Sequence, residues 1–288
     1  MDLVKRALRG NLRAVARLIT QIENDERLAA TAVTQLYSHT GKAHIIGITG
    51  PPGSGKSTLV NECAKTFRQQ EKRVGIIAVD PSSPFTGGAL LGDRVRMRDL
   101  AGDKGIFIRS MASRGSLGGL ARATAATIKV LDAASFEVIL VETVGAGQAE
   151  VDIARTAHTT LVVEAPGMGD DIQSFKAGIL EIADILVVNK VDRPGADKVV
   201  RSLEMMLHLG PAGGTRHHGR SQQTPTPTAN GQEGKWQIPV QPTTAVTGDG
   251  IADLVDLIDR HQAYLLTSGG WLQREKERAR HEIEQLLV

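Results

Sequence analysis

The sequence Ile45-Ile46-Gly47-Ile48-Thr49-Gly50-Pro51-Pro52-Gly53-Ser54-Gly55-Lys56-Ser57-Thr58 decides the fold of this 288-residue chain. It opens with a short β-branched apolar run, which is typical of a buried parallel strand. The pattern Gly50-x-x-x-x-Gly55-Lys56-Ser57 follows and leads into apolar residues at helical spacing. A strand, a glycine-rich loop and a helix in this order indicate a phosphate-binding P-loop.

The residue types of this loop fit the chemistry of a nucleoside triphosphate. Glycines allow backbone N–H groups to turn around phosphate oxygens, and the positive end of the following helix points at them. The ammonium of Lys56 can reach the β- and γ-phosphates, and the hydroxyl of Ser57 can bind Mg²⁺. We expect the nucleotide to contact the whole loop: Gly50, Pro51, Pro52, Gly53, Ser54, Gly55, Lys56, Ser57 and Thr58.

The composition narrows the class of protein. The chain has 34 basic and 32 acidic residues, so its net charge implies no strong attraction to nucleic acid or to a membrane surface. Only 3% of the residues are aromatic, which provides no platform for stacking single-stranded bases. The single cysteine, Cys63, rules out an intrachain disulfide and favours a reducing compartment, the cytoplasm.

Short apolar runs alternate with helical patterns along the chain. The runs lie at 74–79, 105–108, 138–141, 160–163, 185–188 and 237–240, and the clearest helical patterns at 117–133 and 251–265. This alternation predicts an α/β fold with a doubly wound, mostly parallel sheet. Ligands of such sheets bind beyond the carboxyl ends of the strands. Lys56, Asp80, Glu142 and Asn189 all follow strand runs and should converge there.

The flanking segments differ from this central domain, which we place at 43–266. Residues 1–42 predict a helical cap of two short helices, broken at Gly10-Asn11, with a solvated arginine face. Residues 210–234 are polar and read as a flexible surface loop, in which His217-His218 is more typical of solvated side chains than of a metal site. Residues 267–288 predict a charged helix that buries little alone, as a solvated extension or as an arm on another subunit.

The sequence Asn189-Lys190-Val191-Asp192 indicates which base is bound. A carboxylate at Asp192 can accept hydrogen bonds from both N1–H and the exocyclic amine of guanine, and adenine lacks this donor pair. The stem of Lys190 can cover one face of the base. The segment Thr244-Ala245-Val246 fits the backbone loop that contacts the guanine oxygen in G proteins. The expected ligand is therefore GTP or GDP.

Acidic residues at the predicted sheet edge are candidate partners of Mg²⁺. Glu142-Thr143-Val144-Gly145 stands where G proteins carry Asp-x-x-Gly, so Glu142 would hold a magnesium-bound water and the Gly145 N–H would meet the γ-phosphate. Asp80 and Asp93 bracket a loop and are further candidate ligands, giving a predicted metal set of Ser57, Asp80, Asp93 and Glu142.

A water-positioning glutamine is missing from its usual place. Ala146 follows Gly145, and Gln148 stands two residues further along. No arginine finger is evident, although Arg94, Arg96 and Arg114 are candidates. We therefore predict slow intrinsic hydrolysis that a partner accelerates, as in a switch protein.

Several motifs together resemble one family. They are Val79-Asp80-Pro81-Ser82-Ser83, Gly92-Asp93-Arg94, Glu142-Thr143-Val144-Gly145-Ala146-Gly147-Gln148 and the segment 166–173, with Gly10-Asn11-Leu12-Arg13-Ala14 near the start. In combination they are similar to the MeaB/ArgK family of P-loop GTPases, whose G domains are of the SIMIBI type. The resemblance covers about Gly10 to Leu265.

The resemblance implies a function that spacing alone does not. Family members are homodimeric GTPases that act as chaperones: they gate the loading of adenosylcobalamin onto methylmalonyl-CoA mutase and protect that enzyme from inactivation. By similarity, residues 80–97 form switch I, the segment after Glu142 switch II, and residues 166–181 a third switch that contains Asp170 and Lys176. Catalytic roles are then expected for Lys56, Glu142, Asp93 and Lys176.

The chain departs from the family pattern at two places, and two other classes of function compete with the chaperone function. Family members continue past Val288 with a longer helical dimerisation arm, and the 210–234 segment is unusually long and polar. A metallochaperone GTPase would need clustered Cys and His ligands for its metal, whereas this chain has one cysteine and scattered histidines. A kinase linked to amino-acid transport, an older description of the family, would need a phosphoacceptor site and a membrane partner.

Overall fold

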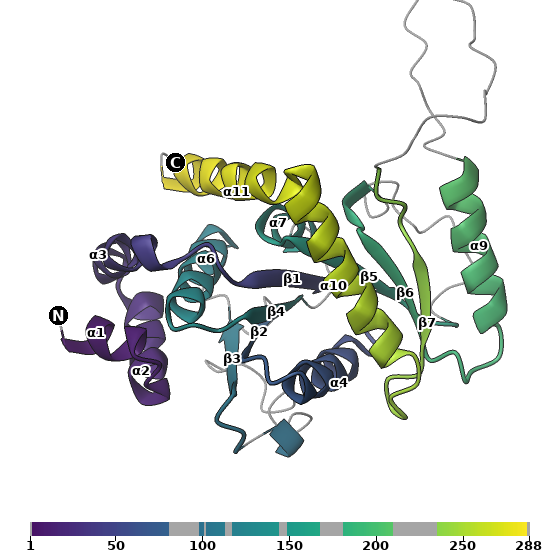
Figure 1. Cartoon of the computed structure of the whole chain (residues 1–288), viewed down its shortest axis with the longest axis horizontal. Helices are drawn as coiled ribbons and strands as arrows, with labels where there is room; N and C mark the ends of the chain where they lie inside the picture. The colour runs from purple at the N-terminus through teal and green to yellow at the C-terminus, as the bar shows by residue number, and fades with distance from the viewer. Residues whose placement is uncertain are drawn as a thin grey trace, which may run out of the picture.

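Seven parallel strands form the centre of the molecule (Figure 1). The computed structural model describes residues 2–80, 98–100, 102–112, 117–143, 149–167, 181–209 and 235–286. The strand order is β3-β2-β4-β1-β5-β6-β7, and each neighbouring pair is parallel. The strands are β1 (His44–Thr49), β2 (Val74–Asp80), β3 (Ile106–Ala112), β4 (Val138–Thr143), β5 (Thr159–Glu164), β6 (Ile185–Asn189) and β7 (Val240–Thr243).

Helices cover both faces of this sheet, which confirms the doubly wound α/β prediction. One face packs against α4 (Lys56–Gln69) and α10 (Ile251–Ser268) through a single buried cluster. The other face packs against α6 (Leu117–Ala133) and α7 (Ala149–Thr156) near the middle, and against α9 (Ala196–Leu209) beside β6 and β7. Because β1 and β4 are buried along their whole length, they read as the continuous apolar runs expected of parallel strands.

The N-terminal cap consists of three helices, so the prediction of two is wrong. They are α1 (Asp2–Leu8), α2 (Leu12–Asn24) and α3 (Glu26–Leu36), followed by the 3₁₀ turn η1 (Tyr37–His39). The predicted break at Gly10-Asn11 is present, and the Asn11 side chain accepts a hydrogen bond from the Ala14 N–H at 2.9 Å. Asp25 makes the second break, because its carboxylate accepts from the N–H groups of Arg27 and Leu28 and caps α3.

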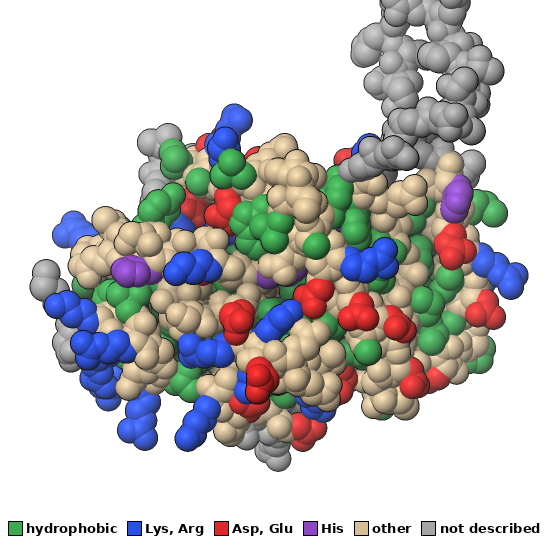
Figure 2. All heavy atoms as spheres, in the orientation of Figure 1, with side chains coloured by type: hydrophobic (Ala, Val, Ile, Leu, Met, Phe, Trp, Pro, Cys, Tyr) green, Lys and Arg blue, Asp and Glu red, His purple; other side chains and the backbone are tan. Residues whose placement is uncertain are grey.

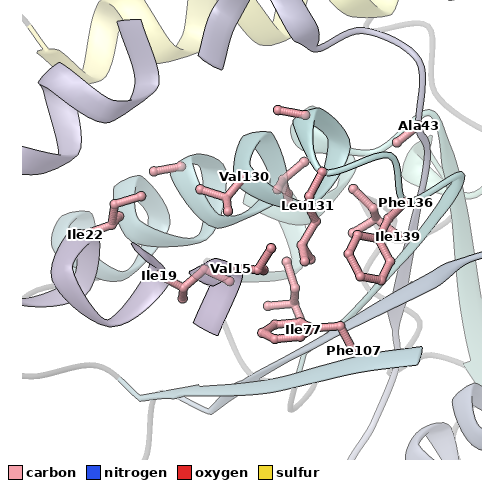
Figure 3. Close-up of a cluster of buried hydrophobic side chains, with 14 of the residues drawn as sticks. Val15, Ile19, Ile22, Ala43, Ile77, Phe107, Val130, Leu131, Phe136 and Ile139 are labelled. Atoms are coloured by element: carbon pink, nitrogen blue, oxygen red, sulfur yellow. The ribbon is translucent and has the colours of Figure 1, made fainter. Parts of the chain in front are cut away.

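The cap shares one hydrophobic core with the sheet (Figure 3). Val15 and Ile19 of α2 are fully buried against Leu131 of α6 and Ile77 of β2. Each such aliphatic side chain contributes about 1.5–3 kcal/mol by its removal from water. The cap is therefore fastened by apolar burial, and Asp132 at the end of α6 reinforces it by accepting from the N–H groups of residues 41–43.

Two strands, β3 and β7, differ from their predicted ranges by more than two residues at one or both ends. The expected strand at 237–240 begins only at Val240, which pairs with Leu186, and continues to Thr243. β3 extends past the predicted Ile108 to Ala112, because its partner β2 continues beside it to Asp80. The polar 210–234 segment lies outside the described residues.

The last helix, α11 (Gly270–Leu286), packs on its own chain against α6, α7 and α10, so it is not a solvated extension, although Arg278 is the one buried side chain among its described residues. Trp271 stacks on His158 at 3.8 Å between ring centroids. Arg274 donates two hydrogen bonds to the Asp184 carboxylate, at 2.8 and 2.7 Å, and a third to the carbonyl of His158. Further along the helix, Lys129 of α6 pairs with Glu282. The inner face of α11 is thus held by polar contacts.

A chain of buried polar groups lies beneath this helix, at the amino ends of the central strands. His44 of β1 contacts the Thr159 hydroxyl at 2.7 Å, and Thr159 contacts His261 of α10 at 2.8 Å. His261 lies 3.4 Å from Asp184, which is the same carboxylate that holds Arg274. Burial lowers the pKa of all three histidines of this region (His44, His158 and His261), and that of His261 falls to about 4.

Candidate nucleotide-binding site

The loop between β1 and α4 is shaped by glycines that no other residue could replace. Gly50 has φ +137° and Gly55 has φ +95°, which L-residues with side chains rarely adopt. A Cβ on Gly50 would lie 2.1 Å from the carbonyl oxygen of Val163, and one on Gly55 would lie 2.3 Å from the Asn189 amide nitrogen. The loop is therefore pressed against the carboxyl ends of β5 and β6, as the sheet-edge prediction requires.

Lys56 begins helix α4 and is 6% exposed. Its ammonium donates to the carbonyl oxygens of Gly50 at 2.8 Å and Pro51 at 3.0 Å, so the charge sits inside the curve of the loop. The N-terminal end of α4 lies at the same place and adds its own partial positive charge. Together these groups form an electropositive cradle for an anion such as a phosphate group.

Ser57 and Glu142 meet at the same edge. The Ser57 hydroxyl donates to the Glu142 carboxylate at 2.6 Å, although the residues are 85 positions apart in sequence. Glu142 is buried in β4 beside β1, and the neighbouring Thr143 hydroxyl donates to that of Thr49 at 3.1 Å. Asp80 ends β2 next to β4, so its backbone lies at this edge also. Hydroxyl and carboxylate oxygens are the donors that Mg²⁺ prefers.

Asn189 connects three parts of the site. Its amide nitrogen donates to the Ser54 carbonyl of the P-loop at 2.8 Å. Its amide oxygen accepts from the Thr243 hydroxyl at 3.2 Å and from the Ala245 N–H at 3.0 Å. The sequence pattern predicts nucleotide contact for Asn189 but not this bracing role. The available signal was its position in sequence. Asn189 directly follows one apolar strand run and the P-loop directly follows another, so both are expected at the same edge of the sheet.

The candidate base-binding residues lie next to this brace. Lys190 has φ +62°, and its ammonium reaches across to the Gly53 carbonyl, so its stem runs along the P-loop. Asp192 follows two residues later and is exposed. Thr244 and Ala245 are buried, whereas Val246 is 82% exposed. The carboxylate of Asp192 is thus accessible to a ligand, and the 244–246 loop is held at the same sheet edge by the hydrogen bond from the Ala245 N–H to Asn189.

Other predicted functional residues lie outside the described residues. They are Asp93, Gly145 and Lys176, together with Arg94, Arg96, Arg114, Ala146, Gln148, Asp170 and the pair His217-His218. Within the described ranges, no group of three or more His, Cys, Asp or Glu side chains is arranged to hold a metal ion. No helix in those ranges combines the length and apolar character needed to cross a bilayer.

Three named relatives are similar in sequence to this chain over most of its length. A GTPase-named protein of Pyrococcus horikoshii is 47% identical, over 100% of this chain and 85% of the relative. The GTPase ArgK of Escherichia coli is 35% identical, over 72% of this chain and 64% of the relative. The mitochondrial methylmalonic aciduria type A homolog of mouse is 33% identical, over 78% of this chain and 50% of the relative.

Solved structures share the fold at low sequence identity. A crystal structure described as an LAO/AO transport system kinase superposes with a TM-score of 0.77 at 22% identity, covering 99% of this chain and 82% of that one. The hydrogenase maturation factor HypB from Archaeoglobus fulgidus gives a TM-score of 0.51 at 17% identity, covering 85% and 97%. Both support the P-loop GTPase fold and nothing finer.

The family model described as methylmalonyl Co-A mutase-associated GTPase MeaB matches residues 15–288, which include every described element of the P-loop edge. With the P-loop, the guanine-type Asn189-Lys190-x-Asp192 segment and the identities above, this match agrees with the resemblance seen in the sequence. The chain therefore belongs to the MeaB family and is a GTPase.

Proposed function

We propose that this GTPase is a chaperone of a cobalamin-dependent acyl-CoA mutase of the methylmalonyl-CoA mutase type. In this proposal it gates the loading of adenosylcobalamin and protects the mutase from inactivation. The observation that carries the proposal is the match of residues 15–288 to a family whose description names that mutase. The similarity to the methylmalonic aciduria type A homolog supports it.

We propose Mg²⁺ as the cofactor of GTP hydrolysis. The residues fit this ion, because the Ser57 hydroxyl and the Glu142 carboxylate are hard oxygen donors 2.6 Å apart at the P-loop. Ser57 would ligate the ion, and Glu142 would hold one of its waters, with Asp80 and Asp93 as further candidates. The bound ion would neutralise phosphate charge. Lys56 would share that role at the β- and γ-phosphates.

Residues of this chain are assigned to GTP binding, whereas none is assigned to orient the water that attacks the γ-phosphate. The P-loop N–H groups and Lys56 would orient the triphosphate, and Asp192, Lys190 and the 244–246 loop would hold guanine. No glutamine directly follows Gly145, so orientation of the attacking water would depend on the partner. We include Lys176 in a third switch that reports the nucleotide state to the mutase.

A homodimer through the C-terminal helices is also part of the proposal. The outer surface of α10 and α11 exposes Leu266, Leu272 and Ile283 to 58–59%. Large apolar side chains at a surface favour a protein interface over solvent. Since the inner face of α11 already packs on its own chain, this outer surface is the part of the helix left for a second copy.

The test is GTP turnover by the purified protein, with and without the cobalamin-dependent acyl-CoA mutase from the same source. Many-fold stimulation by the mutase would support the chaperone function, and Lys176→Ala should lose that stimulation while GTP binding is retained. A mutase that neither stimulates turnover nor forms a complex would overturn the partner assignment and leave the GTPase assignment intact.

A further inference from the structure

A patch of uncompensated positive charge covers the N-terminal cap. Lys5 of α1, Arg9 directly after it, and Arg13 and Arg17 of α2 are all exposed, and we call these four residues the basic face. Figure 2 shows Lys and Arg side chains gathered over the part of the surface where Figure 1 places α1 and α2. No acidic residue occurs in sequence between Asp2 and Glu23.

The next two carboxylates along the chain, Glu23 and Asp25, already have other partners. Glu23, the first acidic residue after Asp2, pairs with Arg109 of β3. Asp25 accepts from two backbone N–H groups as the cap of α3. Among the residues that the structure describes, none forms an ion pair with Lys5, Arg9, Arg13 or Arg17. In a chain of nearly balanced charge, this concentration of cations is local and unmatched.

Helix energetics do not explain the cations of α2. Cations stabilise the C-terminal end of a helix, which accounts for Lys5 and Arg6 in the last turn of α1. Arg13 is in the first turn of α2, where the partial positive charge of the helix end disfavours it. Arg17 lies one turn further, and like charges at this spacing cost about 0.2–0.5 kcal/mol. Folding therefore gains nothing from this pair.

We propose that the basic face is a docking surface for an acidic protein surface, and that the bound protein is the mutase; this inference rests on the proposed function. Positive charge free of local partners steers an oppositely charged protein and fixes its orientation. A membrane is the poorer candidate, because none of the large exposed hydrophobic side chains of the described residues lies on α1 or α2. A surface that binds nucleic acid would also need aromatic side chains that stack on the bases, and α1 and α2 contain none.

The test is a double charge reversal, R13E/R17E, in the full chain. Binding of the purified mutase should weaken about 10-fold or more at low ionic strength, mainly through a slower association rate, and the difference should shrink at about 0.5 M salt. GTP turnover without the mutase should be unchanged, because both side chains are on the cap, away from the P-loop edge. The matched control is K198E/R201E, which reverses two exposed cations of α9.

The outcomes distinguish a failure of the basic-face inference alone from a failure of the chaperone function. A mutase complex that is equally tight for the wild type, R13E/R17E and the control would overturn the basic-face inference and leave the chaperone function standing. Weakening of the complex by the control as much as by R13E/R17E would also overturn it, because the effect would then be one of net charge. If R13E/R17E instead loses binding to phosphatidylserine vesicles while the mutase complex is unchanged, the face serves a membrane. No mutase complex in the wild type overturns both proposals.

Discussion

Lys56 places a buried positive charge at the P-loop, and removal of this side chain should weaken GTP binding. The Lys56→Ala variant loses the only side-chain cation among residues 45–58, and charge-assisted hydrogen bonds of this type are worth about 1.5–3 kcal/mol. We expect GTP affinity to fall about 10- to 100-fold, as measured by titration of a fluorescent GTP analogue. Lys65→Ala is the control, since Lys65 is on the same helix but pairs with Glu62 at the surface. Equal GTP affinity in the two variants would contradict the role of Lys56.

Asp192 provides a test of base recognition by the exchange of a single heavy atom. Asp192→Asn replaces one carboxylate acceptor by an amide donor, which no longer matches the N1–H and amine of guanine. Xanthine carries a carbonyl in place of that amine, so the amide donor should match it. We expect weaker binding of GTP and stronger binding of xanthosine triphosphate, with ATP binding unchanged.

The exposed position of Asp192 makes this substitution safe for folding, and thermal unfolding of the variant should match that of the wild type. Competition titrations with GTP, ATP and xanthosine triphosphate measure the preference directly. An unaltered order of the three affinities would remove Asp192 from the base-binding site.

At the scale of the element, apolar strand runs were predictable and polar packing was not. The buried runs of β1, β4 and β6 marked their strands within one or two residues, and because parallel strands share a carboxyl edge, Ser57 and Glu142 could be expected to meet. Helix α3 was missed because its only strong start signal is the side chain of Asp25. The docking of α11 was missed because Trp271, Arg274 and their partners come from distant parts of the sequence, with no apolar stripe to reveal them.

The attachment of α11 can be tested through its ion pair. Arg274→Ala leaves the Asp184 carboxylate, which is 11% exposed, without its bidentate partner. We expect a loss of about 1–3 kcal/mol in the free energy of unfolding, below the range for fully buried pairs because Arg274 is 29% exposed. Arg280→Ala is the matched control on the same helix, since the Arg280–Glu284 pair is 82% and 57% exposed. Its cost should stay below about 0.5 kcal/mol in urea unfolding. Equal costs would contradict the polar attachment.

The buried histidines make the same region sensitive to acid. Their folded-state pKa values lie below the value of about 6.5 in the unfolded chain, so the unfolded state binds more protons as pH falls through 6.5. Stability is therefore complete above about pH 7 and declines below it. Protonation of His261 or His158 would place a charge near Arg274, against which the carboxylates of Asp184 and Glu275 compensate only in part.

For His261, whose folded-state pKa is about 4, the expected size of this effect is about 1 kcal/mol between pH 7.5 and pH 5.5, a window in which unfolded carboxyl groups hardly titrate. Urea unfolding at the two pH values measures it. His261→Gln should flatten the pH dependence, whereas substitution of the exposed His39 should not. A pH-independent free energy of unfolding over this window would refute the prediction.

At the scale of the whole molecule, the cap and the nucleotide-binding domain share one core and should unfold together. Ile19 of α2 is fully buried in the cluster that also contains Ile77 and Val141 of the sheet. Ile19→Ala should lower the free energy of unfolding by about 2–5 kcal/mol, as large-to-small core substitutions do. Because the cluster is continuous, we expect this loss of free energy of unfolding to apply to the cap and the sheet alike.

The two tryptophans allow this cooperativity to be measured. Trp236 packs on His261 of α10, and Trp271 of α11 packs on His158 directly before β5, so both tryptophans lie far along the chain from α2. Tryptophan fluorescence therefore reports the C-terminal side, while far-UV circular dichroism reports all the helices, including α1 to α3. In the Ile19→Ala variant both signals should shift to the same lower urea midpoint. A circular dichroism transition that precedes an unshifted fluorescence transition would mean that the cap unfolds alone, since the apolar contacts of α2 would then not extend their stabilisation to the sheet.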